Sequence, residues 1–444
     1  MDLLQGNIHK LYRKYLIPAV SSSIAIAIYS FVDTIAIGQS VGALGMAACA
    51  IVLPIFIIAN FIALLCGIGG SVLMSQERGR GHQEKGDAYY TASLLLVLLF
   101  TLLAWITGMV FQVQFYRLCG ADEGVLPYAV EYGSWIFGFL PSFVLTTFLG
   151  CFIRMDGAPK FVMVVTLVGG IINIIGDYVF VFPMQMGMTG AALATVIGSA
   201  VQTVLLLGFL LARKSNLKCR KPEKWLPVLS KILVVGFGAG VSQIAVILIT
   251  FIANNQIMRY SGSAALAVYG MLSTVASLYM SLFNGIGQAA QPIVSTNFGS
   301  GKQDRCWAVG KLGLQTAALF GVFFVGTSLL FPMQITKIFM KVTPEIAEIA
   351  PYIFRVYALS FLPQALNIFV TSYLQSVMHP KMATAIAMAR GMFLNGLLLF
   401  FLPAVMGENG IWWAIPAAEG ITMVIALGYI LLLHRKEKQQ HLPA

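Results

Sequence analysis

Charged residues are scarce in this chain of 444 residues. Aspartate, glutamate, lysine and arginine make up 10% of it, whereas hydrophobic residues make up 58%. A soluble domain of ordinary composition carries about 25% charged residues. The composition therefore excludes a soluble protein held by a single anchor, and it predicts a protein that crosses the membrane many times.

Motifs for the common enzyme chemistries are also missing. The six cysteines are scattered without metal-type spacing, and the five histidines lie in polar loops and tails. The chain contains no GxxxxGK[ST] phosphate loop, no HExxH metal motif and no GxGD aspartate. We therefore predict that it is neither an ATPase nor an intramembrane protease, that it is not an enzyme of another kind, and that it needs no cofactor.

The charge that is present is mostly positive, and the net charge is +11. The basic residues gather in short segments between apolar runs, so membrane topology explains them and no nucleic acid partner is expected. With the N-terminus in the cytoplasm, most of the 28 lysine and arginine residues fall on the cytoplasmic side. This predicts a multi-pass protein of the cytoplasmic (inner) membrane with both termini in the cytoplasm.

Twelve apolar runs are long enough to cross a bilayer. They cover residues 15–38, 46–73, 89–112, 127–150, 161–183, 190–212, 232–257, 265–293, 307–332, 349–375, 383–405 and 411–433. Because the backbone in lipid must satisfy its own hydrogen bonds, these runs predict an all-α fold of twelve transmembrane helices.

An internal repeat divides the twelve runs into two sets of six. The loop Ser75–Glu84 after the second run, with its Gly79-x-Gly81 pair, returns as Ser295–Asp304 after the eighth run. Six crossings separate the copies, so both halves have the same orientation, as in transporters built from parallel repeats. We predict an N-terminal six-helix lobe at 1–212, a basic cytoplasmic linker at 213–231, and a C-terminal six-helix lobe with a basic tail at 232–444.

The first lobe contains two acidic residues inside apolar runs, where each costs about 2.5–3.5 kcal/mol. Asp33 lies in the first run, one helical turn after Tyr29; Asn173 and Asp177 share a face of the fifth run, and Thr195 begins the sixth. A rise of about 1.5 Å per residue places Asp33, Asp177 and Thr195 at one depth. These oxygens suit Na⁺, and paired carboxylates equally suit H⁺ exchange. A polar network that only joins helices is the alternative.

Four other polar residues are candidates for lining a substrate cavity. Asn254, Asn255 and Gln288 lie in the seventh and eighth runs, and Glu419 lies near the middle of the twelfth. Glu419 would suit a cationic substrate. Hydrogen bonds that hold helices together are an equally simple explanation for all four.

Two arginines, Arg355 and Arg390, also fall inside apolar runs. We expect their long side chains to snorkel toward a helix end, with binding of an anionic group as the alternative. They matter for a rival function, a lipid-linked precursor flippase, because that activity would require a cationic cavity for a pyrophosphate.

The sequence resembles the multidrug and toxic compound extrusion (MATE) family over nearly its whole length. The motifs that carry the resemblance are Asp33-Thr34-x-x-Ile37-Gly38, Gly79-x-Gly81, Asn297-x-Gly299, Arg154-x-x-Gly157-x-Pro159-Lys160, Asn173-x-x-x-Asp177, Gly190-Ala191-Ala192-x-Ala194-Thr195 and Gly285-Ile286-Gly287-Gln288. The resemblance implies two pseudo-symmetric lobes around a central cavity, and a cation site in the first lobe formed by Asp33, Asn173, Asp177 and Thr195 with Tyr29 nearby.

The function predicted from these features is secondary active export. Amphipathic, often cationic, organic compounds or metabolites would leave the cell in exchange for H⁺ or Na⁺, with the lipid-linked precursor flippase as the alternative. The expected partners are small organic substrates and the lipid bilayer, and the protein is expected to act as a monomer.

Overall fold

The computed structural model describes residues 3–212, 215–339 and 342–440, and nearly all of them are helical. Residues 213 and 214 of the predicted linker and residues 441–444 of the predicted tail lie outside the described residues, as do residues 1 and 2. The all-α prediction is confirmed for the described part of the chain.

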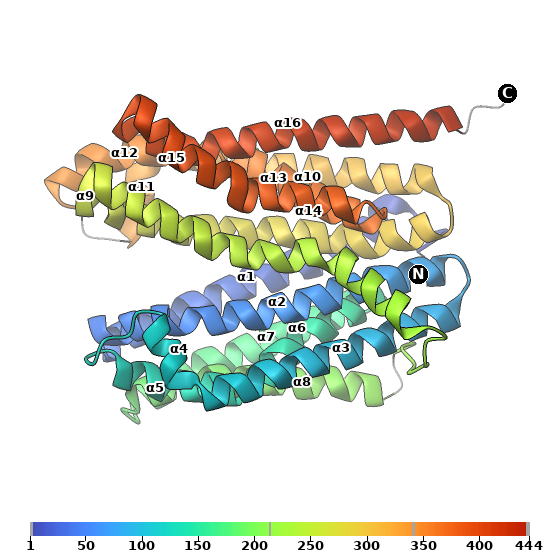
Figure 1. Cartoon of the computed structure of the whole chain (residues 1–444), viewed down its shortest axis with the longest axis horizontal. Helices are drawn as coiled ribbons and strands as arrows, with labels where there is room; N and C mark the ends of the chain where they lie inside the picture. The colour runs from blue at the N-terminus through green and yellow to red at the C-terminus, as the bar shows by residue number, and fades with distance from the viewer. Residues whose placement is uncertain (1–2, 213–214, 340–341, 441–444) are drawn as a thin grey trace. The chain divides into compact units, whose positions relative to one another are not determined.

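Figure 1 shows the helices in chain order. The first half holds α1 (Ile8–Ser40), α2 (Ala43–Gly79), α3 (Gln83–Val110), α4 (Gln112–Leu118), α5 (Leu126–Gly138), α6 (Leu140–Met155), α7 (Pro159–Gly176), the π-helix η1 (Asp177–Val181) and α8 (Gly187–Leu211). The second half holds α9 (Trp225–Gly299), α10 (Gln303–Leu330), α11 (Pro332–Phe339), α12 (Pro344–Ala358), α13 (Phe361–Ser376), α14 (Pro380–Met388), the π-helix η2 (Ala389–Phe393), α15 (Leu394–Met406) and α16 (Glu408–Gln440).

The number of membrane crossings agrees with the twelve apolar runs. Ten helical segments among the described residues are long and apolar enough to cross a membrane, and the bent pair α5–α6 raises the number to eleven. One of the ten is α9, which consists of two helices joined at a non-helical residue, Gly262. Dividing α9 at Gly262 gives twelve crossings.

The repeat extends to the backbone of the turns. Glycines with positive φ occur in pairs at the same spacing as the repeated loop: Gly42 with Gly262, Gly81 with Gly301, and Gly187 with Gly407. At these positions a side chain would strain the backbone, because L-residues with a Cβ rarely adopt positive φ. The same turns therefore end equivalent helices in both halves.

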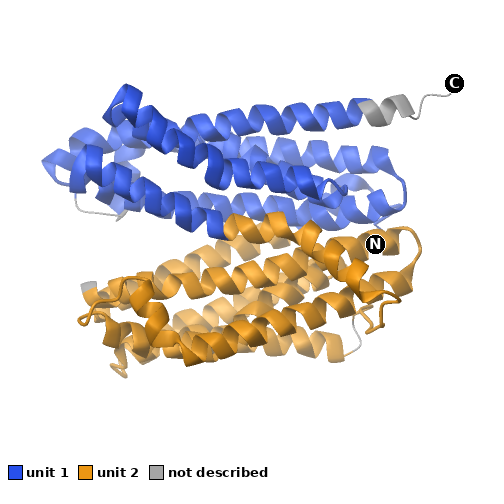
Figure 2. Ribbon diagram, viewed as in Figure 1, with its two compact units in different colours: residues 1–16, 244–444 blue, residues 17–243 orange. Residues whose placement is uncertain are grey.

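The described chain divides into two compact units (Figure 2). Unit 2 contains residues 17–243, and unit 1 contains residues 1–16 and 244–444. The division does not follow the linker at 213–231, because α1 and α9 each contribute residues to both units. The first turns of α1 belong with the second half of the chain, and the first turns of α9 belong with the first half.

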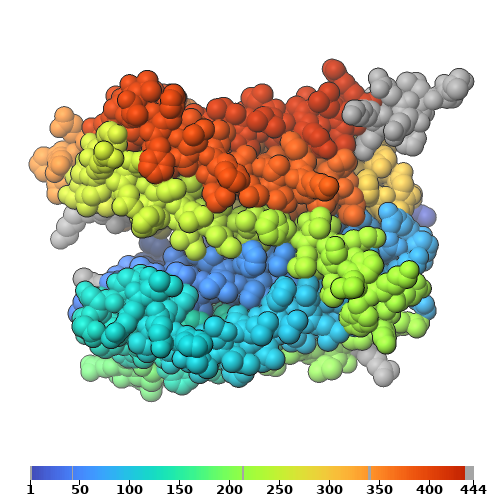
Figure 3. All heavy atoms as spheres, in the orientation of Figure 1, coloured from blue at the N-terminus to red at the C-terminus, as the bar shows by residue number. Residues whose placement is uncertain are grey.

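The outer helices expose apolar faces, as lipid contact requires. From Leu95 to Val110 the exposed large side chains of α3 are hydrophobic, namely Leu95, Leu98, Leu99, Leu102, Leu103, Ile106, Met109 and Val110. Figure 3 shows the side of unit 2 on which the side chains of α3, α4 and α5 form the visible surface. Charged groups are absent from this row of α3 side chains, which suits hydrocarbon rather than water.

At each of the two repeated loops, an arginine forms hydrogen bonds to a neighbouring segment of the chain. In unit 2, Arg78 at the end of α2 pairs with Asp87 at 2.8 Å and Asp156 at 2.7 Å, and it also donates to the carbonyl oxygen of Asn216. In unit 1, Arg305 donates to the carbonyl oxygens of Leu3 and Gly6. Each loop thus fixes the segment that leads into α9 or α1.

Candidate functional site

Glycines bring α7 and α8 into close contact in unit 2. A Cβ on Gly198 would lie 2.8 Å from the carbonyl oxygen of Gly169, and a Cβ on Gly176 would lie 2.9 Å from the Cβ of Ala194. Only helices with small residues at these points can approach so closely. As a result, Asn173 of α7 reaches the side chain of Thr195, the residue that follows Ala194 on α8.

The first helix joins this pair through an aromatic ring. A Cβ on Gly170 of α7 would lie 2.8 Å from Cδ1 of Tyr29, so the tyrosine ring packs directly on the glycine backbone. Asp33 lies four residues after Tyr29 on α1, on the same helix face. The contact therefore turns the Asp33 carboxylate toward α7 and α8.

Three helices meet at the hydroxyl group of Thr195. This hydroxyl donates to Oδ1 of Asp33 at 3.3 Å, and it accepts from Nδ2 of Asn173 at 3.4 Å. Asn173 is buried, while Asp33 and Thr195 are partly exposed. The structure thus brings together Tyr29, Asp33, Asn173 and Thr195, which the sequence placed on three separate crossings.

Asp177 completes the cluster but lacks hydrogen-bond donors. Its side chain is 1% exposed and interacts electrostatically with Asp33. Neither of its carboxylate oxygens has a hydrogen-bond partner among the described residues, and the same holds for Oδ1 of Asn173. Three buried acceptor oxygens therefore have no hydrogen-bond donor among the described residues, and a buried acceptor left unsatisfied costs about 1–3 kcal/mol.

Tyr132 of α5 is a sixth contributor, which sequence reasoning missed. It is buried and interacts with Asp33, Asp177 and Thr195. A single tyrosine in an apolar run has no distinguishing pattern, so only the packing of α5 on α8 reveals its place. Its hydroxyl adds a further group that can donate or accept a proton.

The backbone changes at Asp177. The α-helical part of this crossing ends at Gly176, and residues Asp177–Val181 form the π-helix η1. Short π-helical segments inside membrane or soluble helices often mark functional sites. Here the segment carries the carboxylate that has no partner.

This cluster can bind one small cation or a proton. Its oxygens come from two carboxylates, one carboxamide and hydroxyl groups, which are the hard ligands that alkali and alkaline-earth ions prefer. In the part of the chain that is described, no group of three or more His, Cys, Asp and Glu side chains could hold a metal ion.

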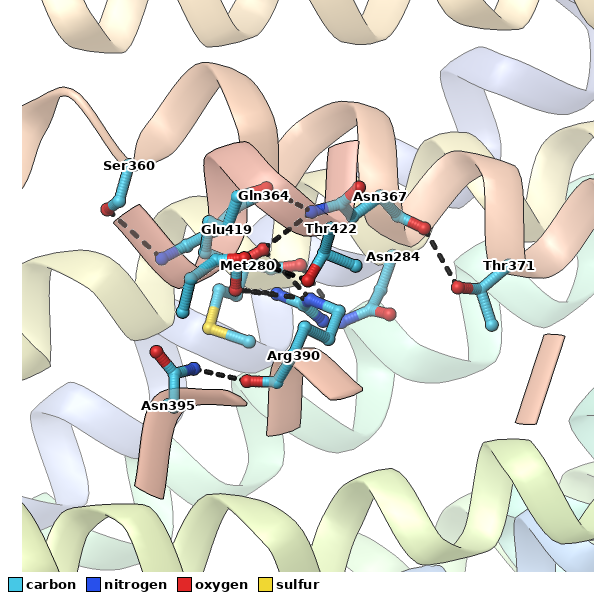
Figure 4. A network of polar contacts seen from close by, with 11 residues as sticks. Met280, Asn284, Ser360, Gln364, Asn367, Thr371, Arg390, Asn395, Glu419 and Thr422 are labelled. Atoms are coloured by element: carbon cyan, nitrogen blue, oxygen red, sulfur yellow. Dashed lines mark hydrogen bonds and ion pairs between the residues drawn. The ribbon is translucent and has the colours of Figure 1, made fainter. Parts of the chain in front are cut away.

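A second polar cluster lies in unit 1, around Glu419 of α16 (Figure 4). Arg390 of η2 donates through Nη2 to Oε1 of Glu419 at 2.8 Å and through Nε to both carboxylate oxygens at 3.1 Å. Asn367 of α13 donates to Oε2 of Glu419 at 2.8 Å. Glu419 is thus a fully paired carboxylate.

The expectation that Arg390 snorkels to a helix end is wrong. The residue lies about 15 Å along the helix from the nearer end of its crossing, too far for its side chain to reach. Glu419 supplies the countercharge instead. Arg355 differs, since it is exposed on α12 and donates to the carbonyl oxygen of Leu329 at 3.4 Å.

The other candidate cavity residues lie on α9. Asn255 is exposed and donates to the carbonyl oxygen of Phe251 in its own helix. Asn254 and Gln288 are partly buried. Glu419 is buried, by contrast, and its carboxylate is held by Arg390 and Asn367.

Known proteins share this architecture. The family model described as MatE matches residues 18–179 and 239–401. The multidrug export protein MepA of Staphylococcus haemolyticus (strain JCSC1435) is 24% identical over 437 residues, which cover 97% of this chain and 95% of the relative.

Two solved structures extend the comparison. That of the MATE multidrug transporter DinF-BH in complex with R6G is 27% identical, with a TM-score of 0.87 and coverage of 98% of both chains. An outward-facing multidrug resistance MATE family transporter of the MOP superfamily has a TM-score of 0.92 at 18% identity and 98% coverage of both, which shows the shared fold. Since the family model matches well over half of the sequence, in both of its halves, the chain belongs to the MATE family of multi-pass membrane transporters.

Proposed function

We propose that this protein is a secondary active exporter that moves amphipathic, often cationic, organic compounds out of the cell in exchange for H⁺ or Na⁺. It acts as a monomer in the cytoplasmic membrane, with both termini in the cytoplasm. The coupling ion binds among Tyr29, Asp33, Asn173, Asp177 and Thr195. Its arrival changes the packing of α1, α7 and α8, and this change lowers the affinity for the bound compound.

The observation that carries the proposal is the set of unsatisfied acceptors beside Asp33. Both oxygens of Asp177 and Oδ1 of Asn173 are buried without a donor. A proton on one carboxylate, or a cation between them, would satisfy these atoms and remove the repulsion between two neighbouring negative charges. Because α1, α7 and α8 each contribute a ligand, occupancy of the site is linked to how these helices pack.

The charge of unit 1 supports export of organic compounds over the flippase alternative. A pyrophosphate carries several negative charges and would need several free cationic groups. Arg390 is neutralised by Glu419, and Arg355 lies at the exposed surface of α12. A net positive cavity of the kind that a pyrophosphate needs is therefore not provided by these two residues.

The deciding experiment is dye uptake into inverted membrane vesicles with separately imposed H⁺ and Na⁺ gradients. We expect one of the two gradients to drive uptake of rhodamine 6G or ethidium by the wild-type protein. Asp33→Asn keeps the size of the side chain but removes its charge, so gradient-driven uptake should fall to the level of empty vesicles. The variant should still insert into the membrane, as measured by its recovery in a monodisperse peak after purification.

A matched control is Glu123→Gln in the same unit. Glu123 is 85% exposed and pairs only with the exposed Arg117, so removing its charge should leave uptake unchanged. Wild-type uptake rates in Asp33→Asn vesicles under both gradients would sink the proposed coupling site. Loss of uptake in both variants would point to a general charge effect instead, and it would count against the assignment equally.

A further inference from the structure

The ion pair Arg390–Glu419 has no evident role in stabilising the fold. It also lies outside the candidate cation site of unit 2. A buried ion pair is weak evidence for stability, because its desolvation penalty often exceeds the attraction between the charges. Charged residues inside membrane crossings are rare and usually mark pathways for ions or substrates. The pair therefore calls for a functional explanation.

The two partners differ in what they present. The Glu419 side chain is 3% exposed, whereas the Arg390 side chain is 13% exposed. Glu419 binds Nε and Nη2 of the guanidinium, and Nη1 makes no hydrogen bond to the rest of the described chain. The group that reaches the open side of this cluster is thus a guanidinium, held in place from behind by a carboxylate.

Donors and acceptors are both available around the guanidinium. Three buried amide oxygens near the pair have no donor among the described residues: Oε1 of Gln364, Oδ1 of Asn367 and Oδ1 of Asn395. Figure 4 shows these residues around Arg390 and Glu419; Gln364 and Asn367 belong to α13, and Asn395 belongs to α15. The cluster combines one unused charged donor with several unused acceptors.

A row of polar residues on α9 leads to the same cluster. Thr274, Ser277 and Asn284 are exposed on this helix, and each donates to a carbonyl oxygen of the preceding turn. Exposed polar side chains on a membrane crossing favour water over lipid as their neighbour. Figure 4 draws Asn284 among the residues around Arg390 and Glu419, so this polar face of α9 lies beside the ion pair.

From this arrangement we infer that Arg390, positioned by Glu419, binds a carboxylate or carbonyl oxygen of the transported compound. The inference rests on the proposed function and concerns those of its substrates that carry such an acceptor beside hydrogen-bond donors, that is, zwitterions and carboxylated amphipaths. The carboxylate accepts from Nη1 of Arg390. Amine or hydroxyl donors of the compound satisfy the unused amide oxygens.

The neutral pair explains why the site prefers a single carboxylate to a pyrophosphate. Seen from far away, the negative charge of Glu419 cancels the positive charge of Arg390. The free N–H groups of Arg390 can nevertheless still donate hydrogen bonds. A hydrogen bond from a charged donor to a charged acceptor is about twice as strong as a neutral one. One carboxylate gains this bond without bringing several uncompensated charges into the membrane.

Two dyes that differ at one group test the inference. Rhodamine 123 is a cationic methyl ester, and rhodamine 110 is the same xanthene dye with a free carboxylate. Binding of each to the purified protein in detergent is measured by fluorescence polarisation, which needs no ion gradient. The quantity compared is the ratio of the two dissociation constants.

The main variant removes both charges, Arg390→Met with Glu419→Gln, so that no buried charge is left without a partner. We expect rhodamine 110 to lose about tenfold in affinity relative to rhodamine 123, as the loss of one charge-assisted hydrogen bond predicts. Arg355→Met, the other arginine within a crossing of unit 1, should leave the ratio unchanged. Arg390→Lys retains a cation beside Glu419 without the planar donor array, and it should shift the ratio in the same direction by a smaller factor.

Three results overturn the inference: a ratio that stays within twofold of wild type in the double variant, an equal loss of both dyes, or a wild-type protein that binds neither dye. If the double variant does not purify as a monodisperse protein, the Arg390→Lys ratio decides alone, and an unchanged ratio refutes the inference. Failure of the Asp33 experiment leaves this ratio untouched, and failure here leaves gradient-driven uptake of cationic dyes untouched.

Discussion

The contact between α7 and α8 yields a quantitative prediction for Gly198→Ala. The added Cβ would lie 2.8 Å from the carbonyl oxygen of Gly169 and 3.2 Å from the Cβ of Asn173. A carbon and a carbonyl oxygen normally stay about 3.3–3.6 Å apart. The two helices must therefore separate by about 0.5 Å, because the obstacle is backbone and cannot rotate away.

Two opposing terms set the stability of this variant. Overpacking costs about 1–3 kcal/mol, while alanine in place of glycine favours the helix by about 1 kcal/mol. The net effect is a destabilisation of up to about 2 kcal/mol. The site is affected as well, since the bond from Asn173 of α7 to Thr195 of α8 is already 3.4 Å long and would no longer satisfy hydrogen-bond geometry after such a shift.

Gly208→Ala on the same helix is the matched control. A Cβ at Gly208 meets nothing within 4 Å, so only the gain in helix propensity remains. Thermal melting of the purified proteins in detergent should place Gly198→Ala below wild type and Gly208→Ala at or above it. Gradient-driven dye uptake should fall in the first variant alone. If Gly198→Ala melts as high as Gly208→Ala and transports at the wild-type rate, the close contact does not position the site.

Two further predictions concern unit 1. Removing only one partner of the ion pair, by Arg390→Met or Glu419→Gln, should lower stability by about 3–5 kcal/mol, whereas the double variant should recover most of it; additive losses in a double-mutant cycle of melting curves would contradict the pairing. Burial lowers the pKa of His379, which lies between α13 and α14 with its Nδ1 2.9 Å from the hydroxyl of Tyr429. Since the unfolded chain then binds the proton more readily, this contribution to stability is present above the unfolded pKa of about 6.5 and is lost as the pH falls below it. Wild-type melting temperatures should fall more on acidification than those of His379→Gln, and identical pH profiles would refute this.

Much of the fold could be predicted from the sequence, because the length of each apolar run determines whether that run crosses the membrane as a helix. Each of the twelve runs became a crossing, and the repeated loop correctly indicated two related halves. The fourth run, 127–150, was predicted as one transmembrane helix, whereas the structure divides it into α5 and α6, which are bent by 49°. Pro141, in the first turn of α6, accounts for the break, because proline cannot donate a backbone hydrogen bond to the preceding turn.

The site in unit 2 was predictable for a different reason. Asp33, Asp177 and Thr195 are each unusual at their depth in a membrane, so counting residues from the helix ends was enough to align them. Counting could not supply Tyr132, because a tyrosine is unremarkable in such a helix. It also could not supply the π-helix at Asp177, since that feature concerns hydrogen-bond spacing rather than composition.

The pairing of Arg390 with Glu419 lay beyond sequence reasoning. The residues are 29 positions apart on different crossings, and a single sequence does not record which faces of two helices meet. Each residue was therefore judged alone, which favoured snorkelling for the arginine and left a substrate contact and a helix-packing hydrogen bond equally open for the glutamate.

The two polar clusters resolve one electrostatic problem in opposite ways. In unit 2, the carboxylate of Asp177 is buried with no donor for either oxygen, so its charge must be met by a proton or an ion from outside. In unit 1, the carboxylate of Glu419 accepts from Arg390 and Asn367, so it needs nothing further. Only a site that lacks its own countercharge can respond to an ion gradient, because a ligand shifts an equilibrium solely through its differential affinity for the two states. The proposed coupling therefore uses the cluster of unit 2, and the proposed contact with the carried compound uses the self-neutralised pair of unit 1.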